Sequence, residues 1–385
     1  MTATLGARAR HAREEPAGAG TGRIVWIDIA KALAIVLVVQ YHVATHASAV
    51  FAGLSGWAWE IWSGLSQLLI PVRMPAFFLV SGVLAANALN RPWRALARPR
   101  YAAILWPYLL WSVVLTVVIA LRGADNPWLA ILERLPRILQ GGDGYWYLST
   151  LVLFFTICRL CRRFPGWLLL GSFILWFFAS LVPSVLPDAT PEALAANVYR
   201  WATFGMWFVI GAFGRAVVLR IGARPSWDLI APAVLSFGLC VWLTDRLRDS
   251  ESFNGIPMSK PLSVTGVALL LSVSVLLARW PAAVRLGLYL AARTLPIYVV
   301  HAVLVYGIRL IAYEQGWLVQ LTDGPNDLAV LVALPLTVVA MVAISTWLAD
   351  LVAGTKLAWF FTAPGGERRE SAEPPPPAEP ITARP

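Results

Sequence analysis

Charged side chains are scarce in this chain. Asp, Glu, Lys and Arg make up 14% of its 385 residues, whereas a soluble globular protein carries roughly 25%. Hydrophobic residues make up 58%. So few charges exclude an ordinary soluble domain and indicate an integral membrane protein. The 19 tryptophans fit this interpretation, because Trp gathers at membrane–water interfaces.

Cysteine is also scarce, with three residues in the whole chain, which excludes a disulfide framework. Cys158 and Cys161 form a C-x-x-C pair, but no second pair and no nearby histidine accompany it. A zinc site needs about four ligands, so this pair is better explained by packing at a helix end, and we predict no metal site.

Acidic residues are fewer than basic ones, 21 against 31, which gives a net charge of +10. In a soluble protein this excess would suggest a nucleic-acid partner. Here the basic residues lie in short loops between apolar runs, where they set membrane topology, so we expect no nucleic-acid partner. The first 23 residues are polar and basic and the next apolar run is too long for a signal peptide.

Ten apolar runs are long enough to cross a bilayer. They cover residues 24–46, 65–88, 101–121, 145–161, 166–186, 201–219, 227–244, 262–279, 294–313 and 328–350. The predicted fold class is therefore all-α: a polytopic integral membrane protein with about ten transmembrane helices.

The distribution of Lys and Arg predicts the orientation. With the N-terminus inside, 21 basic residues fall on the cytoplasmic side and 8 on the other. This bias predicts that both termini are cytoplasmic, and we expect a multi-pass protein of the cytoplasmic membrane. Residues 24–350 form the predicted transmembrane domain. A basic tail (1–23) and a Pro-rich tail (351–385) flank it, and both are expected to be disordered.

The first predicted helix carries four ionisable side chains on one face: Asp28, Lys31, His42 and His46. At about 100° per residue the four fall within a stripe about 60° wide, spread over about 27 Å of helix. Each such group costs about 2.5–3.5 kcal/mol in hydrocarbon, so an ionisable residue within a span indicates function.

Each of these residues has more than one explanation. Asp28 and Lys31, at i and i+3, form a pair that eases insertion or serves function. His42 and His46 have the spacing of metal ligands, but no carboxylate or thiol motif completes a site, and a general base is the better use of a buried His. His46 lies nearer the helix end, so the alternative to a functional role is a position at the membrane interface.

Two further spans and one loop carry candidate residues. The second span reads RMPAFFLVSG, in which Met74-Pro75 predicts a break. Arg73 could stabilise a negative charge that develops during a reaction, or it could extend its charged end to the membrane interface. Ser81 could donate a hydrogen bond to the same negative charge, or it could cap the helix locally. Tyr298 and His301 share a face of the ninth span, where His301 is functional or merely packed.

Four arginines crowd the loop NRPWRALARPRY, more than topology requires. They are Arg91, Arg94, Arg98 and Arg100. A nucleotide-bearing cosubstrate would explain them, because guanidinium groups bind phosphate in a bidentate manner. Membrane lipid headgroups are the alternative partner.

Taken in order, these segments resemble the membrane acyltransferase-3 family, polytopic O-acyltransferases that modify extracytoplasmic sugars. Lys31 and His42 match the family's basic-x10-His motif. The run from Met74 to Gly82 resembles MPxFFxxSG. Trp106-Pro107-Tyr108 follows the arginine-rich loop, Tyr145-Trp146-Tyr147-Leu148 resembles the aromatic start of a middle span, and Ile297-Tyr298-Val299-Val300-His301 resembles IYxxH. The family often has Gly where this chain has Ala32. Some members carry a fused esterase-like domain, which we do not expect here.

The resemblance implies an O-acyltransferase that uses cytoplasmic acyl-CoA, usually acetyl-CoA, as a cosubstrate and binds no permanent cofactor. Its acceptor would be a hydroxyl of an extracytoplasmic or lipid-linked carbohydrate or a glycosylated metabolite. His42 is the expected general base or, in a covalent route, the acyl carrier. The other assigned residues are Asp28, Arg73, Ser81 and His301 for catalysis, Lys31, Arg91, Arg94, Arg98 and Arg100 for the donor, and His46, Tyr298 and Trp146 for the acceptor.

A second hypothesis is a proton-coupled secondary transporter of a sugar, lipid or drug, in which the histidines and Asp28 relay protons. The arginine loop and the ten-residue spacing have no evident role in transport. Matching Gly/Pro breaks in two halves, typical of transporters, are not apparent in the sequence.

Overall fold

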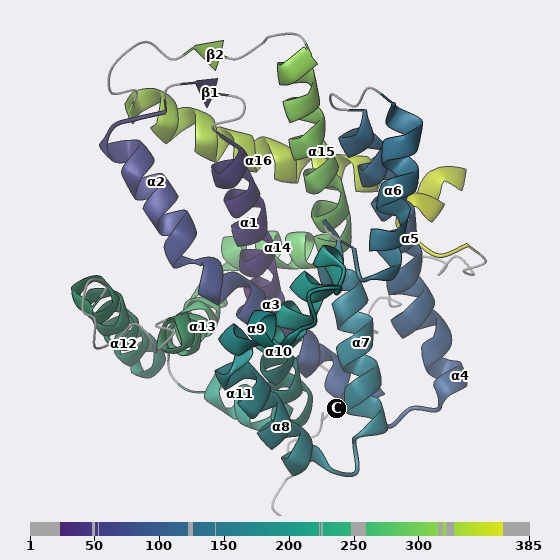
Figure 1. The fold of residues 1–385 in the computed structure, drawn as a ribbon. Helices are drawn as coiled ribbons and strands as arrows, with labels where there is room; N and C mark the ends of the chain where they lie inside the picture. The colour runs from purple at the N-terminus through teal and green to yellow at the C-terminus, as the bar shows by residue number, and fades with distance from the viewer. Residues whose placement is uncertain are drawn as a thin grey trace, which may run out of the picture.

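The computed structural model is almost entirely helical (Figure 1). It describes residues 24–47, 51–52, 54–121, 126–142, 144–222, 224, 226–247, 259–314, 319–320 and 327–364. The N-terminal tail (1–23) and the last 21 positions (365–385) lie outside the described residues.

Sixteen α-helices follow one another in the described parts of the chain. They are α1 (Val25–Ala47), α2 (Trp57–Leu68), α3 (Ile70–Ala85), α4 (Trp93–Leu96), α5 (Ala103–Ala120), α6 (Pro127–Leu139), α7 (Trp146–Leu160), α8 (Pro165–Phe177), α9 (Val182–Val185), α10 (Glu192–Phe213), α11 (Arg215–Gly222), α12 (Ser226–Leu247), α13 (Ser259–Leu277), α14 (Pro281–Ala292), α15 (Thr294–Glu314) and α16 (Asp327–Val352).

Short elements complete the chain. Strands β1 (Phe51–Ala52) and β2 (Val319–Gln320) pair in parallel, with Phe51 opposite Val319. Within the described residues, helical turns of other types lie at Ala86–Ala88, Ala97–Ala102, Ala179–Leu181 and Lys356–Phe360.

The apolar helices confirm an all-α polytopic membrane protein. Among the described residues, seven helices are long and apolar enough to cross a membrane, or up to nine if two bent pairs each count as one span. The bent pairs cover two predicted spans, 166–186 and 201–219. The predicted span 145–161 corresponds to α7, which has only 15 residues. The cytoplasmic location of the termini stays a prediction.

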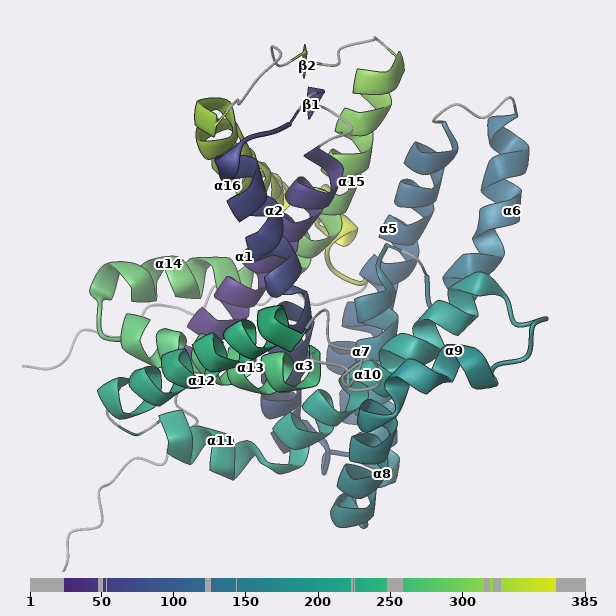
Figure 2. The same ribbon diagram turned by 60° about the vertical axis from the view of Figure 1, so that its left-hand side comes forward.

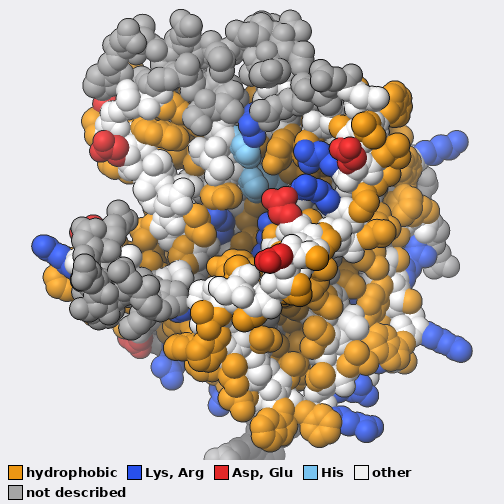
Figure 3. All heavy atoms as spheres, in the orientation of Figure 1, with side chains coloured by type: hydrophobic (Ala, Val, Ile, Leu, Met, Phe, Trp, Pro, Cys, Tyr) orange, Lys and Arg blue, Asp and Glu red, His pale blue; other side chains and the backbone are white. Residues whose placement is uncertain are grey.

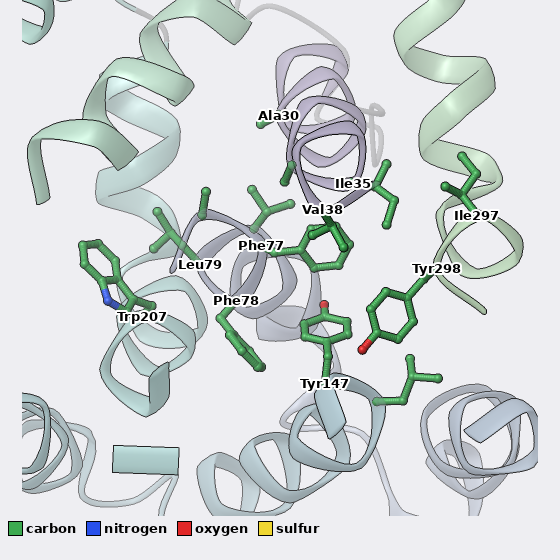
Figure 4. Packing of buried hydrophobic residues seen from close by; sticks show 14 of the residues in the cluster. Ala30, Ile35, Val38, Phe77, Phe78, Leu79, Tyr147, Trp207, Ile297 and Tyr298 are labelled. Atoms are coloured by element: carbon green, nitrogen blue, oxygen red, sulfur yellow. The ribbon is translucent and has the colours of Figure 1, made fainter. Parts of the chain in front are cut away.

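The centre of the bundle is built on α1, α3 and α10. Gly82 of α3 and Gly211 of α10 lie against each other, and a Cβ on either would clash with the other helix's backbone. Two adjacent small residues therefore let the helix backbones approach closely, as in other membrane helix pairs. Phe77, Phe78 and Trp207 belong to the buried core that these helices share (Figure 4).

The predicted break at Met74-Pro75 lies elsewhere. Helix α3 continues through Pro75, and the chain instead breaks at Leu69, between α2 and α3. Pro75 has no N–H to donate to the carbonyl of Pro71. The Ser263 hydroxyl of α13 donates to that carbonyl instead, at 2.5 Å. A neighbouring helix thus satisfies the acceptor that the proline frees.

Helices at the edge are largely exposed. Figure 2 shows α12 and α13 side by side, and α12 packs mainly on α13. Only 6% of the membrane-length window of α12 is buried, against 61% for α1. Such a helix faces lipid, which an apolar surface tolerates.

The C-terminal tail does not begin at residue 351 as predicted. Helix α16 runs to Val352, and the turn Lys356–Phe360 folds back onto α5. The indole N–H groups of Trp106 and Trp111 donate to the carbonyls of Trp359 (2.7 Å) and Phe360 (2.8 Å). The sequence pattern missed this segment because its partners are 250 residues away.

Candidate functional site

The ionisable face of α1 lies against α14 and α15. The Lys31 ammonium donates to the carbonyl of Ala291 at the end of α14, at 3.1 Å. At the other end of the stripe, the rings of His42 and His301 have their centroids 5.1 Å apart. Asp28 is half-buried one turn before Lys31. The periodicity of α1 thus places its polar stripe at a helix interface.

A cavity of about 210 Å³ opens beside Lys31, and we call it the Lys31 cavity. Helices α1, α3, α5, α7 and α15 contribute to it. The side chains that matter for chemistry are those of Lys31, Ser81, Arg100, Tyr147, Thr294 and Tyr298. Most of the remaining lining is apolar.

The polar groups of the Lys31 cavity already have partners. The hydroxyls of Ser81 and Tyr147 lie 2.7 Å apart. Arg100 donates to the carbonyl of Leu84 at 3.0 Å. Ser81, which the resemblance assigns to catalysis, lies in the Lys31 cavity and bonds to Tyr147. Arg73 and Ser81 are eight residues apart on α3, or about 12 Å along its axis, which separates their functions.

The four arginines of the loop do not act as one group. Arg100 lines the Lys31 cavity. Arg91 and Arg94 are exposed. Arg98 donates at 3.4 Å to the carbonyls of both Ala363 and Pro364, in the folded C-terminal segment. The loop therefore supplies one cation to the cavity, two to the surface and one to a structural contact.

Aromatic and imidazole rings surround His42. His46 stacks at a centroid distance of 6.1 Å, and Tyr41 meets His42 edge-on at 5.2 Å. Arg73 is buried and lies 3.6 Å from the centre of the Tyr41 ring. Arg73 is also close enough to His42 for their charges to interact. A histidine in such surroundings has neighbours that hold its ring in place.

The bonding of His301 fixes its tautomer. Its Nδ1 lies 2.8 Å from the carbonyl oxygen of Ile297, which only accepts, so Nδ1 carries the proton. The buried Nε2 atom has no hydrogen-bond partner among the described residues. In the neutral ring Nε2 is therefore an acceptor, within one ring contact of His42.

His46 pairs with Arg309, which lies near the end of the predicted span 294–313 and was not predicted as a site residue. Arg309 of α15 donates to Nδ1 of His46 at 2.9 Å. Because guanidinium groups only donate, Nδ1 accepts and the His46 proton is on Nε2. No signal within α15 marks Arg309 as the partner of a histidine 263 residues earlier.

A second cavity, of about 140 Å³, lies beside His42 and is called the His42 cavity. It is formed by α1, α15 and α16. Its polar lining consists of His42, His46, Arg309 and Thr337, and apolar residues such as Val43, Val305, Leu334 and Met341 supply the rest.

Tyr298 connects the two ends of the site. It lines the Lys31 cavity, and its ring lies 6.0 Å from that of His301. Figure 4 shows the hydroxyl of Tyr298 pointing toward Tyr147. Tyr298 therefore joins the cavity that Lys31 lines to the ring contacts of His301 and His42.

The aromatic residue at the start of α7 that meets the cavity is Tyr147, one position after the predicted Trp146. Trp146 stacks on Phe204 at 5.5 Å and receives Arg200 over its ring at 4.9 Å, on the side of α10. Neighbouring residues on a helix point about 100° apart, so one of two adjacent aromatics faces the cavity and the other packs.

Histidine side chains are visible from one face of the molecule, although His301 itself is buried. Figure 3 shows histidine side chains at the bottom of a hollow, with Lys, Arg, Asp and Glu side chains around it. Within the parts of the chain that the structure describes, no three His, Cys, Asp or Glu side chains gather as a metal site.

Comparison with known proteins agrees with this arrangement. A family model described as an acyltransferase domain (Acyl_transf_3) matches residues 24–350. The chain is also 28% identical over 205 residues to the inner membrane protein YcfT of Escherichia coli (strain K12), a match that covers 48% of this chain and 56% of that relative. No solved structure matches the chain. Because the family model covers most of its length, the chain belongs to the acyltransferase-3 family and is a multi-pass integral membrane protein with an acyltransferase domain.

Proposed function

We propose that this acyltransferase moves an acyl group from acyl-CoA to a hydroxyl of a carbohydrate, glycolipid or glycosylated metabolite, with His42 as the general base. The observation that carries the proposal is the layout of α1. Cations line a cavity at one end, imidazoles gather about 16 Å along the same helix, and Tyr298 and His301 lie between them.

The cationic end suits the phosphates of coenzyme A. Lys31 and Arg100 line one cavity, and each donates to a backbone carbonyl. A phosphate is a stronger partner than a neutral carbonyl because the hydrogen bond is charge-assisted at both ends. The exposed Arg91 and Arg94 extend the positive surface, and Asp28 offsets part of the charge of Lys31. In this proposal the cationic end faces the cytoplasm.

The space between the two ends suits a thin, extended group. The distance of about 16 Å along α1 separates Lys31 from His42. A pantetheine arm that enters the Lys31 cavity would pass Ser81, Tyr147 and Tyr298, whose hydroxyls offer hydrogen bonds to its amides. This assigns Ser81 and Tyr147 to donor binding.

At the histidine end, the transfer needs one base and one cation. The acceptor O–H attacks the thioester carbonyl while His42 takes its proton. The new C–O bond forms, the C–S bond breaks, and the leaving thiolate of coenzyme A receives the proton from the His42 imidazolium. Arg73 stabilises the oxyanion. His301 orients His42 through its fixed tautomer.

The acceptor would enter through the hollow in which the histidines are visible (Figure 3). Polar and charged side chains around this opening suit a hydroxylated molecule. Arg309 holds His46 near the opening, so that His46 can contact the acceptor without serving as the base.

Transfer of radiolabelled acyl groups in membranes tests the proposal. Membranes that contain wild type are compared with His42→Ala and with Thr45→Ala, an exposed position one turn further along α1. We expect label from acetyl-CoA or a longer acyl-CoA in an extractable glycan or glycolipid with wild type and Thr45→Ala, and none with His42→Ala. Equal labelling by all three would rule out His42 as the base.

A covalent acyl-His42 route is distinguished from direct transfer by a second labelling experiment. Brief incubation without acceptor, followed by denaturation, would leave label on the protein with wild type and not with His42→Ala. Under direct transfer the wild-type protein remains unlabelled.

A further inference from the structure

The His42 cavity is apolar apart from four side chains, and three of these already form hydrogen bonds within the protein. Arg309 donates to His46, and the hydroxyl of Thr337 donates to the carbonyl of Ala333 in its own helix at 2.7 Å. The remaining lining includes Val43, Leu334 and Met341, of which Leu334 is 1% exposed. The cavity thus offers a hydrocarbon surface beside His42.

A carbohydrate is a poor occupant for such a cavity. Each buried hydroxyl needs a hydrogen-bond partner or costs free energy. No carboxylate, amide or tryptophan side chain lines this cavity in the described chain. The hollow with charged side chains in Figure 3 suits an acceptor better, and in Figure 1 helix α16, which carries Leu334 and Met341, crosses behind α1 and α15. The hollow and this cavity are therefore suited to different ligands.

The cavity continues the path of the donor. A thioester that reaches His42 from the Lys31 cavity points its acyl group beyond His42, toward His46 and the end of α1. The His42 cavity is lined by these same residues of α1. Its volume is about 140 Å³, and an apolar cavity of about 150 Å³ is large enough to hold benzene. An acetyl group would leave most of this space empty, whereas a chain of four to six carbons would fill it.

We infer that the His42 cavity is the binding site for the acyl chain of the donor, and that the enzyme prefers short-chain acyl-CoA of about four to six carbons to acetyl-CoA. This inference rests on the proposed function, since it requires coenzyme A in the Lys31 cavity. It deepens that function by naming the class of acyl group.

Binding of thioether analogues of acyl-CoA, which cannot be hydrolysed, tests the inference. The full chain is purified into lipid nanodiscs and titrated calorimetrically with coenzyme A and with the acetyl, butyryl, hexanoyl and octanoyl analogues. We expect affinity to rise about fourfold for each methylene buried, up to hexanoyl, and to rise no further with octanoyl.

Two variants of α16 and one control sharpen the measurement. Leu334→Trp fills the cavity, so hexanoyl should bind within about twofold of acetyl, whose affinity stays unchanged. Met341→Ala enlarges the cavity, so octanoyl should bind at least about fourfold tighter than hexanoyl. Leu336 lies on the same helix but is 61% exposed. Leu336→Trp should therefore leave the order of affinities as in wild type.

Each outcome decides the matter. Affinity that is independent of chain length in wild type overturns the acyl site while leaving the proposed function intact. A Leu334→Trp protein that weakens acetyl and hexanoyl equally does the same. If Leu334→Trp does not fold, Met341→Ala alone decides, because unchanged octanoyl affinity overturns the inference. Failure of wild type to bind coenzyme A overturns both the inference and the proposed function.

Discussion

The two ends of the polar stripe on α1 differ in the partners of their ionisable groups. At the Lys31 end, cations donate to the backbone carbonyls of Ala291 and Leu84. At the His42 end, rings contact rings, and Arg73 lies over Tyr41. A carbonyl is readily replaced by an incoming anion, whereas a packed ring keeps its position. The first arrangement is suited to binding and the second to a reaction that needs fixed geometry.

Removal of His42 is the most severe test of this difference. We expect His42→Ala to lower the rate at saturating donor by about 10²–10⁴-fold, the range that a general base contributes. The affinity for coenzyme A should stay within about twofold, because the phosphates lie about 16 Å away. Steady-state transfer kinetics together with calorimetric binding measure both. A matched loss of affinity would contradict the division of labour between the two ends.

Removal of Lys31 should give the opposite pattern. A hydrogen bond to a charged group contributes about 1.5–3 kcal/mol, so Lys31→Ala should weaken donor affinity by about 10- to 100-fold while keeping most of the rate at saturation. Lys31→Arg serves as the control, because it keeps the charge in the Lys31 cavity. If Lys31→Ala lowers the saturated rate as much as His42→Ala does, Lys31 takes part in the reaction itself.

The sequence predicts the positions of Lys31 and His42 at the two ends of the stripe better than it predicts the rest of the site. Helical periodicity suffices to place Lys31 and His42 on one face, because both lie on a single regular helix. The structure places the His301 ring beside that of His42, and the catalytic role that the resemblance implied for His301 stays a prediction. These predictions concern residues whose position depends on one helix or on one contact between helices.

Features that depend on several helices could not be predicted. Tyr147 faces the Lys31 cavity and Trp146 packs on α10, a choice set by the rotation of α7 within the bundle. The helix α14 lies in a segment that was predicted as a loop, because 12 residues are too few to span a bilayer. The pairing of Arg309 with His46 joins residues 263 positions apart, and no local pattern encodes it.

His301 tests whether the reaction end depends on ring geometry as well as on the base. Its Nδ1 donates to Ile297, and its Nε2 is an acceptor near His42. We expect His301→Gln to lower the saturated rate by roughly tenfold, less than the loss of about 100-fold that a misplaced reacting group can cause, and to leave donor affinity unchanged. The pH–rate profile separates a positioning role from simple misfolding, since only positioning would shift the titration of His42. An unchanged rate and profile would limit His301 to packing.

The smallest effect should distinguish two arginines within one loop. Arg100 lines the Lys31 cavity, whereas Arg94 is exposed at the surface. An exposed cation often contributes no more than about 0.4 kcal/mol, so Arg94→Ala should change the affinity for coenzyme A by about twofold at most. Arg100→Ala should weaken it by about fivefold, a partly screened version of the effect at Lys31. Titrations at two salt concentrations check the comparison, because screening should remove the contribution of Arg94 first. Equal effects of the two variants would mean that the phosphates bind at the surface of the loop, outside the Lys31 cavity. Donor binding would then depend on the arginine loop more than on α1.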